Sequence, residues 1–128
     1  MSKRCPCGSG EIDDACCGML HAGVPAPTAL ALMRSRYTAY VRGELDYLAG
    51  TQRAPLDRAA AGRWSRDTLW MGLEIVQTHA GGEDDATGVV EFIARGVTAG
   101  KPFTMRERSR FEKVDGRWIY VDGQTRQS

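Results

Sequence analysis

The sequence predicts an α+β protein in which helices pack on a curved four-stranded antiparallel sheet, with a zinc knuckle at the N-terminus. Three observations support this fold class. All four cysteines lie within residues 5–17, apolar residues recur at helical spacing over 28–66, and after Asp67 the period changes to two. Helices followed by antiparallel strands are typical of α+β domains. We expect a knuckle over 1–22, a linker over 23–27, one domain over 28–123 and a polar tail over 124–128.

The composition is that of an ordinary single domain of 128 residues. The formal net charge of +1 excludes the global basic field that many nucleic-acid-binding proteins carry. No apolar run approaches the ~20 residues of a membrane span, and no apolar leader precedes the cysteines. We therefore expect a cytoplasmic protein with no membrane partner, and in that compartment clustered cysteines bind metal more often than they form disulfides.

The cysteine spacing predicts one structural zinc ion per chain. Cys5 and Cys7 form a C-x-C pair, and Cys16 and Cys17 are adjacent. Four thiolates suit tetrahedral zinc, which binds sulfur at about 2.3 Å. The fourth ligand stays open between two residues, because adjacent cysteines diverge unless the chain turns between them. His21 is the rival of Cys17 for that position.

Segments 5–10 and 16–18, Cys-Pro-Cys-Gly-Ser-Gly and Cys-Cys-Gly, resemble the SEC-C motif. This motif is a zinc knuckle found at the C-terminus of the bacterial preprotein-translocase ATPase. The resemblance implies that the ligands are the same four cysteines, or a histidine in the last place. Many members have basic residues before the second cysteine pair, whereas residues 10–15 here read Gly-Glu-Ile-Asp-Asp-Ala. A partner-binding surface that depends on basic residues at these positions is therefore not expected.

The first long helix is predicted to begin at Thr28, as N-cap, and to end before Gly43. One face is apolar and should face the core: Leu30, Met33, Tyr37, Tyr40 and Val41. The opposite face should be solvated: Arg34, Thr38 and Arg42. Shorter helices are expected over 44–49 and 58–66. Four strands should follow, over 69–76, 87–97, 103–114 and 117–121.

The third strand should place a carboxylate in the interior. Its apolar face reads Phe103, Met105, Glu107, Ser109 and Phe111. An inward carboxylate is costly unless it is paired or hydrogen-bonded. We expect Glu107 to form an ion pair with Arg36 of the covering helix; alternatively, it is the ionisable group of a pocket that binds or transforms a small molecule. Trp118, with Tyr120 and Asp122, should face inward as core or pocket wall. No catalytic constellation appears, so an enzyme is not expected.

Three further segments, 32–40, 107–111 and 116–123, together with the cysteine motif, resemble the YchJ-like family of small bacterial proteins. The resemblance spans nearly the whole chain. It implies a cone-shaped domain like that of nuclear transport factor two, with the zinc knuckle at its N-terminus. It implies no settled biochemical activity.

The functional expectation is a zinc-binding, non-enzymatic protein whose knuckle is a structural module that binds a macromolecular partner, in first place a protein. The first alternative is small-molecule binding or catalysis around Glu107. The second is association with RNA or the ribosome through Lys3, Arg4 and a stripe of outward arginines: Arg106, Arg108 and Arg110. We expect Glu74 and Glu91 on neighbouring strands to neutralise this stripe.

Overall fold

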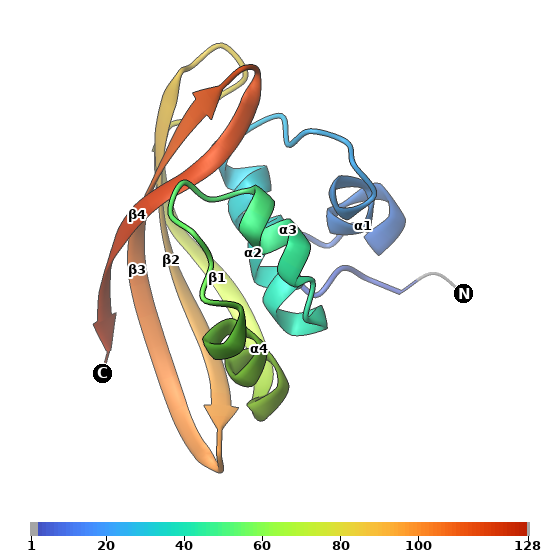
Figure 1. Ribbon diagram of the computed structural model, residues 1–128, viewed down its shortest axis with the longest axis vertical. Coiled ribbons are helices and arrows are strands. Elements are labelled where there is room, and N and C mark those ends of the chain that lie inside the picture. The colour runs from blue at the N-terminus through green and yellow to red at the C-terminus, as the bar shows by residue number, and fades with distance from the viewer. Residues whose placement is uncertain (1–2, 128) are drawn as a thin grey trace.

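The protein is built in three layers, as a computed structural model of residues 3–127 shows (Figure 1). A curved antiparallel sheet forms the first layer. The second contains α2 (Ala29–Arg42), α3 (Leu45–Gly50) and α4 (Arg58–Asp67). The cysteine-rich segment packs on the side of α2 that faces away from the sheet. The expected α+β class, with helices on one face of a four-stranded sheet, is confirmed.

The helix boundaries follow the capping residues. The Thr28 hydroxyl accepts a hydrogen bond from the Ala31 amide at 3.0 Å, which satisfies a donor that the first turn leaves free. Gly43 ends α2 in the left-handed region at φ 74°, where a glycine has no Cβ to clash. None of the helices within residues 3–127 is long and apolar enough to cross a membrane.

The sheet is a meander whose strands pair in chain order. The strands are β1 (Thr68–Ala80), β2 (Thr87–Thr98), β3 (Lys101–Val114) and β4 (Arg117–Gln127). The C-terminal ends of two strands differ from the expected bounds. β1 continues beyond residue 76, and residues 124–127, expected to be a tail, pair with β3 as the end of β4. Ser128, the last residue of that expected tail, lies outside the described residues.

A register shift in the β3–β4 pair corrects the expected inner face of β4. The shift lies between Arg110 and Phe111. Trp118 is 2% exposed and Tyr120 contacts Phe111 in the interior, but the extra residue turns Asp122 outward. There its carboxylate accepts two hydrogen bonds from Arg110, at 2.7 and 2.6 Å.

The face of α2 expected to be solvated is in fact covered by the knuckle. Thr38 is fully buried. The Arg34 guanidinium donates to the Cys7 carbonyl at 2.8 Å, and Arg42 forms an ion pair with Asp13 at 2.9 Å. The knuckle therefore packs directly on α2, although the linker separates the two in sequence. This face of α2 was expected to be solvated because its side chains are polar. Polar side chains also form the surface on which the knuckle docks, so the sequence pattern is the same in both cases.

Candidate metal centre

A small hairpin followed by two helical turns brings the cysteines together. Arg4 and Ile12 form an antiparallel bridge, and the Cys5 amide donates to the Glu11 carbonyl at 2.9 Å. The chain between them turns through Gly8 and Gly10, at φ 81° and 89°, a conformation that residues with a Cβ rarely adopt. Next come a 3₁₀ turn, η1 (Asp13–Ala15), and a short helix, α1 (Cys17–His21).

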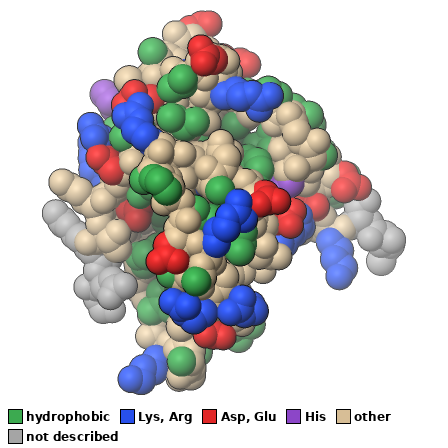
Figure 2. Space-filling view, in the orientation of Figure 1, with side chains coloured by type: hydrophobic (Ala, Val, Ile, Leu, Met, Phe, Trp, Pro, Cys, Tyr) green, Lys and Arg blue, Asp and Glu red, His purple; other side chains and the backbone are tan. Residues whose placement is uncertain are grey.

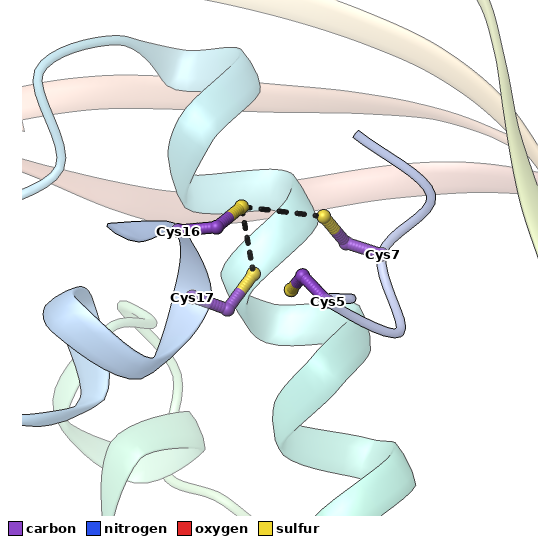
Figure 3. Close-up of side chains that lie close together, drawn as sticks. All are labelled: Cys5, Cys7, Cys16 and Cys17. Atoms are coloured by element: carbon purple, nitrogen blue, oxygen red, sulfur yellow. Dashed lines mark hydrogen bonds between the residues drawn. The ribbon is translucent and has the colours of Figure 1, made fainter. Parts of the chain in front are cut away.

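The four sulfur atoms form one compact cluster (Figure 3). All four Sγ atoms lie within 4.8 Å of one another, with 3.6 Å between Cys7 and Cys16 and 4.0 Å between Cys16 and Cys17. In a tetrahedron with metal–sulfur bonds of about 2.3 Å, the sulfurs lie about 3.8 Å apart. These separations far exceed the ~2.05 Å of a disulfide, and all four cysteines are free thiols. The cluster therefore has the dimensions of a tetrahedral metal site.

His21 lies outside this cluster. Its Nε2 is 2.8 Å from the Ser35 carbonyl oxygen, and its ring packs against Tyr47 with 4.4 Å between centroids. Within residues 3–127, the group of side chains that could hold a metal ion consists of the four cysteines and does not include His21. Cys17 takes its place in the cluster because the chain turns sharply at Cys16, whose backbone angles are φ −135° and ψ −121°.

Two hydroxyl groups contact the sulfurs. The Ser9 Oγ is 3.2 Å from the Cys16 Sγ, and the Thr38 Oγ1 is 3.7 Å from the Cys5 Sγ. Such outer contacts orient metal ligands and tune their affinity. Neither hydroxyl was expected to contact a sulfur, and Thr38 was expected to be solvated. Ser9 lies inside the motif and could have been found, whereas Thr38 is 33 residues from Cys5 and no local pattern marks it.

The thiols do not ionise alike. A hydrogen bond from the Cys17 thiol lowers the pKa of Cys7, and the same bond, with burial, raises the pKa of Cys17. Burial raises the pKa of Cys16. A divalent cation supplies the charge that lets several neighbouring thiols bind as thiolates. The donor set therefore fits a soft or borderline cation.

The second group of residues singled out from the sequence lies between α2 and the sheet. Glu107 and Arg36 line one cavity, but no ion pair joins them, which corrects the expected pairing. The Glu107 carboxylate instead accepts hydrogen bonds from the hydroxyls of Ser109, Tyr120 and Thr125. Trp118 does not line this cavity; it borders a groove on the side of α1, near His21.

The outward arginines of β3 are paired with acids. Arg106 and Arg108 contact the Glu91 carboxylate at 2.5 and 3.8 Å, and Arg110 pairs with Asp122. Glu74 was expected to contribute but pairs with Arg95 of β2. Charges of both signs are also mixed over the face in Figure 2. The stripe is therefore not a free cationic surface.

A four-cysteine knuckle docked on a cone-shaped α+β domain defines a protein of the SEC-C motif class. Residues 28–123 match the family described as "YchJ, middle NTF2-like domain", and the chain belongs to this YchJ-like family. A "UPF0225 protein" of Chromobacterium violaceum is 51% identical over 124 residues, covering 93% of this chain and 90% of the relative.

Two solved structures are similar over most of the chain. The solution structure of a SEC-C motif containing protein from Rhodopseudomonas palustris has a TM-score of 0.83 and 35% identity, covering 94% of this chain and 96% of that one. The crystal structure of a SEC-C motif containing protein from Psychrobacter arcticus has a TM-score of 0.77 and 29% identity, covering 92% and 80%. The resemblance to both families is confirmed.

Proposed function

We propose that Cys5, Cys7, Cys16 and Cys17 hold one zinc ion whose role is structural. The observation that supports this most is the mutual approach of all four sulfurs within 4.8 Å. Four protein ligands complete a tetrahedral shell, whereas catalytic zinc sites keep a position for water or substrate. The assignment suits a protein of the reducing cytoplasm, where thiols remain available to metal.

The knuckle serves in this proposal as a non-enzymatic module that binds a partner protein. Its support is three exposed apolar side chains along the knuckle and the start of the linker, a segment that zinc would help to hold in place. They are Ile12, Met19 and Val24, with 41%, 40% and 46% of their surface exposed. Such side chains would supply apolar contacts to a protein partner. The paired arginines of β3 give the RNA alternative no support.

One experiment tests both parts. Native mass spectrometry of the purified protein should find one zinc per chain, and crosslinking in cells should then identify a partner. Changing Ile12, Met19 and Val24 together to serine should abolish that crosslink. The matched control is Leu69→Ser with Met71→Ser, since these β1 side chains are also exposed, at 65% and 62%. Equal crosslinking by both variants, or by a metal-free Cys16→Ser/Cys17→Ser protein, would refute the proposed role.

A further inference from the structure

The interior of the cone contains a cavity of about 230 Å³ between α2, α4 and the concave face of the sheet. Seven of its fifteen lining residues are aromatic: Tyr37, Tyr40, Trp64, Trp70, Phe92, Phe111 and Tyr120. Since a cavity of about 150 Å³ accommodates benzene, this one has room for roughly nine or ten non-hydrogen atoms. The aromatic wall favours a flat ring, because rings associate by stacking and edge-to-face contact.

Two opposite charges line this cavity without pairing. Arg36 is 8% exposed and forms no ion pair within residues 3–127. Its guanidinium donates to the Leu48 carbonyl, the Thr51 hydroxyl and the Gln52 amide oxygen. Because a guanidinium has five N–H donors, two remain for a ligand. Glu107 is held by three hydroxyl donors, and both charges are thus fixed in place by neutral groups.

A third polar side chain of the wall, Trp70, differs from Arg36 and Glu107 because it forms no hydrogen bond among the described residues. The indole N–H of Trp70 is buried without a hydrogen-bond acceptor among the described residues, and Trp70 lines the cavity. Buried donors without an acceptor are rare in native proteins and call for an explanation. Because its Nε1 has less than 1 Å² of accessible surface, this N–H does not face the open volume of the cavity. The wall therefore offers donors from Arg36 and an acceptor at Glu107.

We propose that this cavity binds a small planar heterocycle with a hydrogen-bond acceptor on one edge and an N–H donor on another, the pattern of a nucleobase-type lactam ring. Arg36 binds the acceptor edge, Glu107 accepts from the ring N–H, and the aromatic wall holds the ring faces. This binding is separate from the proposed role of the knuckle, and its failure would leave the zinc assignment intact.

The three tryptophans provide the readout. Trp64 and Trp70 line the cavity, whereas Trp118 lies outside it. The zinc-loaded protein is titrated with uracil and with hypoxanthine, and the three indole N–H resonances are followed by NMR. Indene serves as a flat control without polar groups. Saturable shifts of Trp64 and Trp70, with Trp118 unchanged, are the expected result. No shift up to the solubility limit, equal movement of all three, or tighter binding of indene would overturn the proposal.

Two variants distinguish specific recognition of the ring from non-specific binding in an apolar cavity. Glu107→Gln should weaken hypoxanthine binding about tenfold, because it removes a charged acceptor. The matched control is Glu112→Gln, on the same strand but outside the cavity wall; it should leave binding unchanged. Ala94→Leu, which fills part of the cavity, should abolish binding and keeps the test informative if Glu107→Gln does not fold. Equal losses from the two glutamine variants, or unchanged binding to Ala94→Leu, would contradict the assignment.

Discussion

Two adjacent cysteines can share one metal ion only where the backbone between them turns sharply. Here the turn occurs at Cys16, and Gly18 makes room for it. A Cβ at Gly18 would lie 2.6 Å from the Asp13 carboxylate and 2.9 Å from the Asp13 carbonyl oxygen. The carboxylate is in turn fixed by Arg42 of α2, so it cannot move aside freely. At this scale the geometry of the candidate metal site depends on a glycine as well as on the four cysteines.

Gly18→Ala should therefore weaken the knuckle. Overpacking of this kind costs about 1–3 kcal/mol, which corresponds to a loss of about 5- to 150-fold in zinc affinity. Competition with a chromogenic chelator measures the affinity. Gly50→Ala is the control, because a Cβ at Gly50 meets nothing within 4 Å. Equal affinity of the Gly18 variant and the wild type would show that η1 and α1 can separate at no cost.

The chemistry of individual residues was predictable where it depended on spacing along the chain. The approach of the four cysteines, the Thr28 cap and the inward position of Glu107 all followed from local patterns. The partners of Arg36 and Glu107 did not, because each depends on where distant segments meet. Arg36 donates to residues of α3 and the loop after it, and Glu107 accepts from residues of β4.

Helix α2 is the element that joins the cysteine cluster and the cavity. One side carries Arg34 and Thr38, which contact the knuckle, and another carries Arg36, Tyr37 and Tyr40, which line the cavity. Cys5, Cys7 and Cys17 lie in the same apolar cluster as buried residues of α2, β2 and β3. The knuckle is thus part of the packed core of the domain.

Removal of the metal should therefore destabilise the whole domain. When the free zinc concentration is a thousandfold above the dissociation constant, binding contributes about 4 kcal/mol to the free energy of unfolding. Because the knuckle and the sheet share one core, the sheet is stabilised as well. Denaturant unfolding followed by circular dichroism, with and without chelator, should show one transition at a lower midpoint. Added zinc should restore the midpoint. Loss of the knuckle alone, with an unchanged sheet transition, is what a knuckle isolated by its linker would show, and it would contradict this packing.

Strand periodicity predicted the four strands but not their irregularities. A bulge adds one residue and reverses the alternation beyond it. In β1 the register shifts between Trp70 and Gly72, so Leu69 and Met71 are exposed while Trp70 and Leu73 pack inward. Gly72, at φ 145°, is the residue in β1 that could have indicated the bulge, because an isolated glycine inside a strand often marks one. The faces of β3, which show no such ambiguity in sequence, were predicted correctly.

For the molecule as a whole, the packing of the helices on one face of the sheet was predictable. The docking of the knuckle on α2 was not predicted, and the hollow interior was only an alternative to an ion pair between Arg36 and Glu107. Composition and periodicity indicate how many apolar residues face inward, but the curvature of the sheet decides whether they meet. Here the aromatic side chains of α2, α4 and β1 touch at their edges, with 4.9 Å between the Trp64 and Trp70 centroids. They surround the cavity without filling it.

This aromatic interior should make the protein sensitive to alkali. All four tyrosines have a raised pKa, with burial as the largest cause: Tyr37, Tyr40, Tyr47 and Tyr120. A raised pKa means that the folded state favours the neutral phenol. The resulting stabilisation is complete below the ordinary pKa of about 10 and is lost as the pH rises above it.

The free energy of unfolding, measured in denaturant at a series of pH values, should therefore be level with respect to these groups below about pH 10 and fall above it. Tyr40→Phe is the informative variant, because the phenol of Tyr40 has no hydrogen-bond partner among the described residues and its loss removes one ionisable group. Its alkaline decline should be shallower than that of the wild type. An equally steep decline would assign the effect to other groups, and a level profile well beyond the ordinary tyrosine pKa would mean that the phenols ionise with the fold intact.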